Sequence, residues 1–387
     1  MKVVFTGAAG GHFYPLIAIA EALGEVVASR RLVTPQLYYL SDKPYDEQAL
    51  FAHNLTYVHI PAGKVRRYFS LQNISDFFVT LSGFFAALGV LFRIYPDVVV
   101  SKGSYASVPV VLAASLLRIP IIIHESDAKP GRANLFAASR ATRIAVSYDS
   151  SISFFPLKYR GKIARTGIPI RKDIRNLPDP RDTVSAFALT PSLPTILVLG
   201  GSSGSLRINE TLIDALPDLL SFANVIHQTG KTHIKEVSAR SHVVLGSSAH
   251  AGTYNPIAFL GVDTLRASAA LSNLVISRAG ATSIAEISLW QKPAILIPIP
   301  ESISHDQRTN AHAYAHLGAG SVLEESNLTP HVLASEARRI LTTPGVASTM
   351  STHATGFANP EAATMIAEEI VRIGLTHEPK TLAPTVV

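Results

Sequence analysis

Two glycine-rich loops, each lying between an apolar strand and a helix, constrain the fold of this chain more than any other sequence feature. The first covers residues 7–12 (GAAGGH) after a strand expected over 2–6, and the second covers residues 200–204 (GGSSG) after a strand expected over 194–199. Glycine lets the backbone approach a ligand closely, and the helix N-terminus behind such a turn offers N–H groups and partial positive charge to phosphate. The pair predicts two nucleotide-binding-type domains that face one cleft, each able to hold an anionic group.

Length and composition narrow the class of protein. A chain of 387 residues suits two domains, and 47% hydrophobic with 16% charged residues is typical of a globular protein. The sequence contains no cysteine, which excludes disulfides, thiolate nucleophiles and cysteine metal sites. A net charge of +6 favours an anionic partner. No basic and aromatic platform supports nucleic acid, so a phosphorylated ligand and an anionic membrane surface are the expected partners.

The order of predicted elements indicates an α/β fold with parallel sheets, because strands and helices alternate in both halves. Turn residues crowd residues 165–192, which we interpret as a linker. The predicted organisation is a domain over 1–165, a second over 166–350, a C-terminal helix within 351–375 that packs back on the first domain, and a flexible tail over 376–387. Further strands are expected at 36–40, 97–101, 119–124, 142–147, 223–227, 254–260, 273–277, 293–298 and 320–323, and helices at 15–28, 76–93, 104–117, 130–138 and 360–373. Since no signal-peptide pattern precedes the first strand, we expect a cytoplasmic location.

One helix stands apart, because residues 77–92 carry no charge and follow the basic residues Lys64, Arg66 and Arg67. Sixteen residues fall short of the ~20 that span a bilayer. A buried core helix is one interpretation. Five phenylalanines beside a basic cluster favour the other, attachment to an anionic membrane surface.

His12 emerges where the first glycine loop enters its helix. An imidazole there suits the acceptance of a proton, but it could equally cap the helix or bind a phosphate, and the spacing leaves these readings open. The spacing of Gly7, Gly10 and Gly11 differs from G-x-G-x-x-G, and no acidic residue directly ends the second strand. Nicotinamide and flavin chemistry are therefore disfavoured.

Polar residues gather after the strands between 273 and 311. Glu286 lies in a helix after one of these strands and could accept two hydrogen bonds from a ribose diol, or could complement the helix dipole. Asp306, Gln307 and Asn310 begin the next helix at strand-exit height, where ligands of open α/β sheets bind.

Taken together, the motifs of the chain resemble the MurG family of bacterial glycosyltransferases (glycosyltransferase family 28). The resemblance covers about residues 1–375 in the expected order. The motifs that carry it are GAAGGHFYP (7–15), PDVV (96–99), HE (124–125), GIPIR (167–171), GGSSG (200–204), RAGATSIAE (278–286) and DQRTNA (306–311).

The resemblance implies a GT-B fold of two Rossmann-like doubly wound domains facing a central cleft, and an inverting transfer of GlcNAc with no metal and no cofactor. The implied donor is UDP-GlcNAc, and the implied acceptor is the 4-hydroxyl of undecaprenyl-diphosphate-MurNAc-pentapeptide, which receives a β-1,4 linkage in peptidoglycan synthesis. The implied location is the cytoplasmic face of the cell membrane, as a peripheral protein. Other cell-wall synthesis proteins are implied as further partners.

The same resemblance assigns roles to individual residues. The implied donor-binding residues are Arg171, Ser202, Ser203, Leu260, Glu286 and Gln307. The implied acceptor and diphosphate residues are Gly10, Gly11, His12, Glu125 and Asn134. The implied catalytic residues are His12 and Asp127, with the identity of the base left open between them.

The chain departs from the family pattern at three places. Ser126 and Asp127 stand where the family commonly has glutamine and asparagine, Ser203 replaces a glutamine, and Ile168 replaces an asparagine. Asp127 brings a negative charge near the cleft and is an alternative or assisting base. Three other functions stay open: another membrane-associated GT-B transferase such as a diacylglycerol glycosyltransferase, a UDP-GlcNAc 2-epimerase, and a non-catalytic UDP-sugar-binding scaffold.

Overall fold

The computed structural model describes residues 1–8, 10–64, 72–201, 204–246, 248, 250–303 and 306–377. The chain forms two compact units, with Met1–Arg171 and Glu361–Val387 in unit 1 and Lys172–Pro360 in unit 2. The sequence analysis placed the first boundary after residue 165. The predicted tail from residue 378, Arg66, Arg67, Ser202 and Ser203 lie outside the described residues.

Unit 1 is built on a seven-stranded sheet of order β3-β2-β1-β4-β5-β6-β7, in which every neighbouring pair is parallel. The strands are β1 (Lys2–Thr6), β2 (Gln36–Ser41), β3 (Leu55–His59), β4 (Val98–Ser101), β5 (Ile121–Glu125), β6 (Arg143–Val146) and β7 (Ile163–Arg165). The sequence analysis did not predict the two edge strands, β3 and β7. The strand order reverses between β1 and β4, which creates a switch point at their carboxyl ends.

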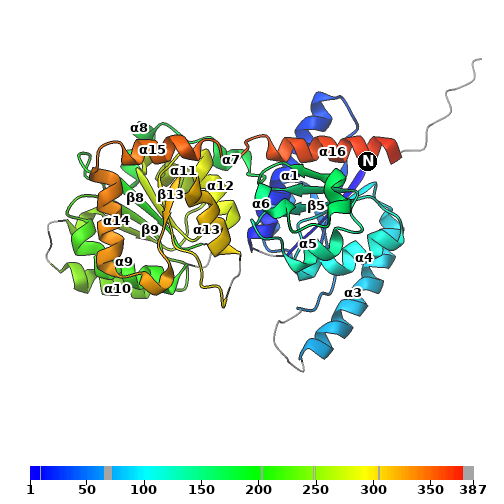
Figure 1. Cartoon of the computed structure of the whole chain (residues 1–387), viewed down its shortest axis with the longest axis horizontal. Helices are drawn as coiled ribbons and strands as arrows, with labels where there is room; N and C mark the ends of the chain where they lie inside the picture. Colours follow the sequence, from blue (N-terminus) through cyan, green and yellow to red (C-terminus); the bar gives the residue numbers. More distant parts are fainter. Residues whose placement is uncertain are drawn as a thin grey trace, which may run out of the picture. The chain divides into compact units, whose positions relative to one another are not determined.

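Helices cover both faces of this sheet (Figure 1). One buried cluster joins β1 to α1 (Phe13–Ser29) and α16 (Ala362–His377), and α1 and α16 pack against each other. The other cluster joins the opposite face to α3 (Gln72–Ile94), α4 (Val108–Leu116) and α5 (Arg132–Ala137). The remaining elements are η1 (Gly10–His12), α2 (Glu47–Ala52), η2 (Tyr105–Ser107), α6 (Asp149–Ile152) and η3 (Leu157–Lys162).

Unit 2 contains a six-stranded parallel sheet of order β10-β9-β8-β11-β12-β13. Its strands are β8 (Thr195–Leu199), β9 (Asn224–Gln228), β10 (Tyr254–Ile257), β11 (Leu274–Ser277), β12 (Ala294–Leu296) and β13 (Gly320–Val322). The order reverses between β8 and β11. Two parallel sheets, each with one reversal, confirm the predicted fold of two doubly wound domains.

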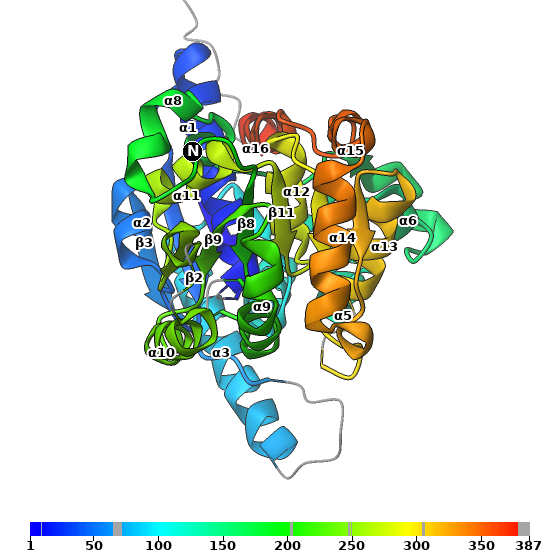
Figure 2. The same cartoon turned by 90° about the vertical axis from the view of Figure 1, so that its left-hand side faces the viewer.

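A buried cluster of unit 2 joins the sheet to α9 (Leu206–Leu219), α10 (Ile234–Leu245) and α14 (Pro330–Thr342) (Figure 2). α9 is strongly amphipathic in sequence, and its apolar stripe packs on β8 and β11, as burial of a helix face requires. The other helices are α7 (Lys172–Arg175), α8 (Pro180–Thr183), η4 (Val184–Ala186), η5 (Ala251–Thr253), α11 (Val262–Leu271), α12 (Ala281–Leu289), α13 (Gln307–His316), η6 (Glu325–Asn327) and α15 (Val346–Ala354).

α3 is far longer than its buried contacts require. Within it, Ala87 and Leu91 belong to the core, whereas the side chains of Phe77, Phe78 and Phe85 are each more than 60% exposed. Figure 1 shows its N-terminal end projecting away from the sheet of unit 1. Residues 74–94 are long and apolar enough to cross a membrane, and most of this stretch lies outside the protein core. The core interpretation therefore accounts for only one side of the helix.

A buried polar cluster lies beneath the second glycine loop. His227 on β9 lies 2.8 Å from Tyr254 Oη through Nδ1 and 3.0 Å from Asn209 Oδ1 through Nε2. Asn209 on α9 also donates to the carbonyl of Thr229 at 2.9 Å. Burial lowers the pKa of His227 to about 3. The folded unit therefore holds this imidazole neutral at acidic pH, where an unfolded chain would protonate it.

We predict that unit 2 loses about 2 kcal/mol of stability through His227 between pH 7 and pH 5. The pKa of His227 is about 3 in the folded state and 6.5 ordinarily, so its contribution is complete above about 6.5 and is lost as the pH falls toward 3. The chain has one tryptophan, Trp290, which is buried in unit 2, so its fluorescence reports urea unfolding of this unit. His227→Gln should reduce the difference between the two pH values, and His242→Gln, at an exposed position, should not. An unchanged difference in His227→Gln contradicts the prediction.

Candidate active site

The two switch points bring the sequence-predicted residues to the carboxyl ends of the strands. In unit 1 the first glycine loop leaves β1, and Lys102 follows the neighbouring strand β4. In unit 2 the second glycine loop leaves β8, and Arg278 follows the neighbouring strand β11. Ligands of open parallel sheets bind outside the strand ends where the order reverses. Each unit therefore presents one candidate half-site, built from a glycine loop and the end of the adjacent strand.

Glu125 organises the loop after β5 in unit 1. Its buried carboxylate accepts hydrogen bonds from the N–H groups of Asp127 and Gly131, both at 2.9 Å, and from Asn134 Nδ2 at 3.0 Å. Asn134 also donates to the carbonyl of His124 at 3.1 Å. Three N–H donors on one carboxylate favour its ionised form, although burial and the Asp127 charge raise the pKa of Glu125. Glu125 and Asn134 therefore hold Asp127 at the strand exit.

His12 lies in η1 at the entrance to α1 and is half-buried. Burial, reinforced by the positive charge of Lys102, lowers the pKa of His12 to about 4, while the charge of Asp127 and a hydrogen bond to the Lys102 main chain act in the opposite direction. Its Nδ1 has no hydrogen-bond partner among the described residues. A neutral imidazole with an unengaged nitrogen can accept a proton.

Arg171 belongs to unit 1, whereas the other described donor residues expected from the resemblance belong to unit 2. Its guanidinium lies 4.4 Å from the centre of the Tyr14 ring, on α1. The Tyr14 hydroxyl in turn donates to Asp46 Oδ2 at 3.1 Å. Stacking on an aromatic ring helps to hold a guanidinium in place.

The second glycine loop forms a tight entry to α9. Gly204 has a φ of +78°, and a Cβ at this position would lie 2.1 Å from the carbonyl oxygen of Thr229, so no other residue fits there. Ser205 caps α9 by accepting a hydrogen bond from the Ile208 N–H at 3.4 Å. The helix N-terminus behind the loop is a site for anionic groups.

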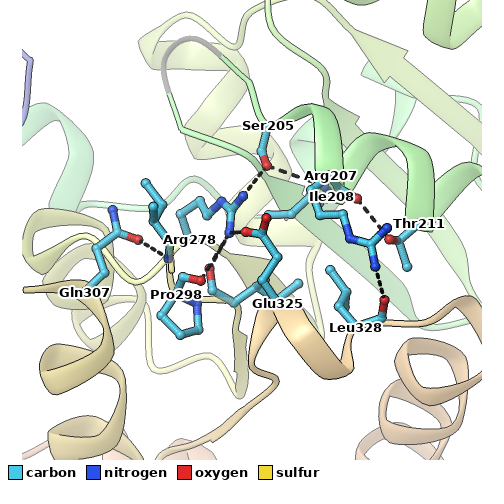
Figure 3. A network of polar contacts seen from close by, with 11 residues as sticks. Ser205, Arg207, Ile208, Thr211, Arg278, Pro298, Gln307, Glu325 and Leu328 are labelled. Carbon is cyan, nitrogen blue, oxygen red and sulfur yellow. Dashed lines mark hydrogen bonds and ion pairs between the residues drawn. The ribbon is translucent and has the colours of Figure 1, made fainter. Parts of the chain in front are cut away.

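Arg278 ties three segments of unit 2 together behind this loop (Figure 3). Its Nη2 donates to Ser205 Oγ at 2.7 Å, and its Nη1 pairs with Glu325 Oε2 at 2.6 Å. Nη1 also lies 3.3 Å from the carbonyl of Pro298, at the exit of β12. Gln307, the first residue of α13, accepts a hydrogen bond from Ile299 N–H at 3.2 Å in the same region.

Gln228 is a residue of the site that the sequence analysis missed. It ends β9, donates to the carbonyl of Gly201 at 2.9 Å and accepts from the N–H of Leu260 at 2.9 Å. It thus connects the second glycine loop to the segment of Phe259 and Leu260. Phe259 is partly exposed, and Lys231 Nζ lies 5.3 Å from the centre of its ring. The signal available in the sequence was its place directly after the strand predicted over 223–227.

The structure gathers the expected residues into two sets. Unit 1 brings together, through a chain of contacts, Gly10, Gly11, His12, Glu125, Asp127 and Asn134, with Arg171 on the same unit. Unit 2 carries Leu260, Gln307 and the half-buried Glu286 on α12. Lys102 and Arg278 join these sets as buried or nearly buried cations that the sequence analysis did not select as site residues. Within the described part of the chain, no group of three or more His, Asp or Glu side chains is arranged to hold a metal ion.

Comparison with known families gives two matches that follow each other along the chain. Residues 3–146 match the glycosyltransferase family 28 N-terminal domain. Residues 195–369 match the glycosyltransferase family 28 C-terminal domain. The two matched segments contain both glycine loops and both switch points.

Curated relatives align over most of their own length. The chain is 34% identical over 339 residues to the UDP-N-acetylglucosamine--N-acetylmuramyl-(pentapeptide) pyrophosphoryl-undecaprenol N-acetylglucosamine transferase of Treponema denticola, covering 85% of each chain. It is 35% identical over 343 residues to the protein of the same name from Lachnospira eligens, covering 88% of this chain and 90% of that one.

Solved structures share the fold. The crystal structure of MurG from Acinetobacter baumannii superposes with a TM-score of 0.73 at 23% identity, covering 96% of this chain and 99% of that chain. The UDP-GlcNAc 2-epimerase from Neisseria meningitidis bound to UDP-GlcNAc superposes with a TM-score of 0.65 at 14% identity, covering 96% and 100%. At these identities the likeness concerns the fold alone.

We predict that Arg278 and Glu325 are energetically coupled by about 1–3 kcal/mol, because both side chains are mostly buried and share one network. The coupling follows from a double-mutant cycle with Arg278→Met and Glu325→Gln, measured by urea unfolding and Trp290 fluorescence. Arg339 and Glu336 on α14 form the matched control pair, and a more exposed pair of this kind should couple by less than about 0.5 kcal/mol. Equal coupling in the two cycles would show that the Arg278 network adds nothing beyond a surface ion pair.

Proposed function

Since the chain belongs to glycosyltransferase family 28, we propose that it transfers GlcNAc from UDP-GlcNAc to the 4-hydroxyl of undecaprenyl-diphosphate-MurNAc-pentapeptide. The observation that carries the proposal is the alignment, over at least 85% of both chains, with relatives named for this reaction. The product is a β-1,4-linked disaccharide on the lipid diphosphate, an intermediate of peptidoglycan synthesis. The reaction inverts the configuration of the anomeric carbon because a single displacement is proposed.

Unit 2 is proposed to bind the donor. The diphosphate would lie at the N-terminus of α9, where backbone N–H groups and the helix dipole favour negative charge. As the bond to the sugar breaks, charge develops on the leaving UDP, and preorganised donors there stabilise the transition state. Glu286 is proposed to accept hydrogen bonds from the ribose diol, and Gln307 to contact the sugar. The segment around Leu260, tied by Gln228 to the second glycine loop, is proposed to contact the uracil.

Unit 1 is proposed to bind the acceptor and supply the base. The 4-hydroxyl oxygen attacks the anomeric carbon while its proton passes to the base, and the bond between that carbon and the UDP oxygen breaks. His12, held neutral, is the proposed base, and Asp127 is the assisting or alternative one. Gly10 and Gly11 would lie along the acceptor diphosphate, and Glu125 and Asn134 support the loop that carries Asp127.

Membrane association is proposed to run through α3, at the cytoplasmic face of the membrane. The exposed phenylalanines of this helix give an apolar surface, and Lys64 precedes it while Arg93 ends it. An apolar helix face combined with basic residues binds anionic lipid interfaces. A 2-epimerase with the same fold acts on a soluble nucleotide sugar and has no use for such a face, so α3 favours a lipid-linked acceptor.

We predict that His12→Ala lowers kcat for GlcNAc transfer at least ~100-fold, because a positioned general base contributes about this much. The measurement is transfer from UDP-GlcNAc to a short-chain analogue of the undecaprenyl-diphosphate-MurNAc-pentapeptide acceptor. Donor affinity should stay near that of the wild type, since His12 lies in unit 1. The exposed His331→Ala is the control and should transfer normally. Near-normal kcat in His12→Ala would remove His12 as the base and leave Asp127.

We predict that Glu286→Ala lowers kcat/KM for UDP-GlcNAc ~100-fold with most of the effect in donor binding, because a ribose contact is made before and during the reaction. Direct titration with UDP separates this loss from a catalytic one.

The same assay tests two alternative functions. If the wild-type protein binds UDP-GlcNAc and transfers nothing, it acts as a scaffold. Transfer to diacylglycerol in place of the lipid-linked sugar would identify a different membrane transferase.

We predict that replacing Phe77, Phe78 and Phe85 together by serine weakens binding to vesicles containing anionic lipid at least ~10-fold, since each exposed ring buries apolar surface at the interface. Sedimentation with vesicles at low and high salt measures the loss. Phe51→Ser is the matched control, because this phenylalanine is 87% exposed on α2 and should not affect binding. Arg66→Ala with Arg67→Ala should weaken only the salt-dependent part. Unchanged binding of the triple variant would exclude α3 as the membrane contact.

A further inference from the structure

Lys102 is a buried cation that the proposed mechanism does not use. It directly follows β4, its side chain is 1% exposed, and its N–H continues the β1–β4 pairing by donating to the carbonyl of Thr6 at 2.8 Å. Its Nζ donates to Ser126 Oγ. A buried ammonium is costly unless opposite charge and hydrogen bonds compensate it. Its presence at the switch point therefore needs an explanation.

The backbone around Lys102 fits this side chain closely. A Cβ at Gly7 would lie 3.1 Å from Lys102 Cβ, so the lysine stem packs against the bare backbone of the first glycine loop. Ser104, two residues after the lysine, has a φ of +75°, a conformation that residues other than glycine adopt rarely. The lysine is thus held between the first glycine loop and the loop after β5, at the end of a strained turn.

Four titratable side chains influence this ammonium or are influenced by it. Burial lowers the pKa of Lys102, and the charges of Glu125, at the end of β5, and Asp127, in the loop after it, act in the opposite direction. His12, from the first glycine loop, and His124, on β5, both have their pKa lowered by the Lys102 charge. The same charge lowers the pKa of Glu125. Lys102 is the shared electrostatic neighbour of both proposed bases, His12 and Asp127.

We propose that Lys102 is a positioning residue of the acceptor site, whose stem packs on the first glycine loop and whose buried ammonium, bonded to Ser126 Oγ, compensates the carboxylates of Glu125 and Asp127 beside the His12 imidazole. This inference rests on the proposed function, because it assigns Lys102 a part in preparing the base of the transfer. Lys102 does not touch the substrate in this scheme. It acts through the groups beside it, by charge and by packing on the first glycine loop.

The other unit gives independent support from topology. Arg278 follows Ser277 at the end of β11, the strand that flanks the switch point of unit 2, as Lys102 follows Ser101 at the end of β4. Arg278 also pairs with a carboxylate and contacts the serine that caps the helix behind its glycine loop. The chain thus places a largely buried cation behind each glycine loop. In unit 2 the cation, Arg278, is bonded to Glu325 and Ser205. In unit 1 the cation, Lys102, interacts with the proposed bases His12 and Asp127.

The compensation also accounts for the departure at positions 126 and 127. The related family commonly has two uncharged amides there, whereas this chain has Ser126 and Asp127. Ser126 Oγ accepts a hydrogen bond from the Lys102 ammonium, and the positive charge of Lys102 compensates the negative charge of Asp127. Lys102, Ser126 and Asp127 are therefore linked by a hydrogen bond and by charge.

The test follows the protonation of His12 when the charge is removed. Lys102→Gln keeps a donor for Ser126 Oγ and removes the charge, Lys102→Met removes both, and Lys102→Arg keeps the charge. The His12 ring is followed by NMR titration, with its signal assigned by its loss in His12→Gln. We expect His12 to titrate at least about one pH unit higher in Lys102→Gln and Lys102→Met and near the wild-type value in Lys102→Arg, because the ammonium disfavours a second positive charge nearby. An unchanged His12 titration in a folded Lys102→Gln protein overturns the inference, whether or not transfer is observed.

Transfer kinetics give the second readout. The acidic limb of kcat/KM for the acceptor should move to higher pH in Lys102→Gln. A rise of one unit from a His12 pKa of about 4 makes the loss relative to wild type about twofold greater at pH 5 than at pH 8. Lys102→Arg should restore the wild-type profile. A loss of equal size at every pH would mean that Lys102 serves packing only. Failure of the wild-type protein to transfer GlcNAc would reject the proposed function instead, and the NMR titration would still decide the role of Lys102.

Discussion

The close approach of backbone and neighbouring groups at each sheet reversal is the constraint on which both halves of this chain depend. A Cβ at Gly7 would press on Lys102, and a Cβ at Gly204 would lie 2.1 Å from the carbonyl of Thr229. The turn between strand and helix must therefore be bare at these points. α1 and α9 begin after these turns, and the backbone N–H groups at a helix N-terminus favour the binding of phosphate. Glycine at these two positions thus serves both the close packing at the sheet reversal and the expected binding of anions at each helix N-terminus.

The two half-sites share a plan but differ in what surrounds the cation. Arg278 forms an ion pair with the Glu325 carboxylate. It also donates hydrogen bonds to the carbonyl of Pro298 and to Ser205 Oγ, the cap of α9. A guanidinium with several fixed contacts suits a site that binds one ligand in one pose. Lys102 donates to Ser126 Oγ and lies among titratable side chains. The difference matches the proposed division of labour, since donor binding needs rigidity and deprotonation of the acceptor needs tuned charge.

The sequence alone was sufficient to predict the strands that are buried on both faces of each sheet. Strands such as β1, β4 and β8 are continuous apolar runs, which is how parallel strands covered by two helix layers appear in a sequence. The edge strands β3 and β7 were not predicted; both are partly buried, and β7 has just three residues. Lys102 and Arg278 could not be selected as site residues for a different reason. Their importance depends on which strands flank the reversal, and strand order is a property of the assembled sheet rather than of any local pattern.

Asp127 illustrates how the assembled sheet changes the meaning of a residue. Read along the chain, it introduces a negative charge where the related family commonly has an amide. In the folded unit the charge lies beside a buried ammonium from a strand exit far away in sequence. Lys102 is buried, and a buried ammonium without opposite charge nearby is costly. Asp127 shares its compensation with Glu125. In the proposed acceptor site, the charge of Asp127 therefore bears on how the base is positioned rather than on whether the fold forms.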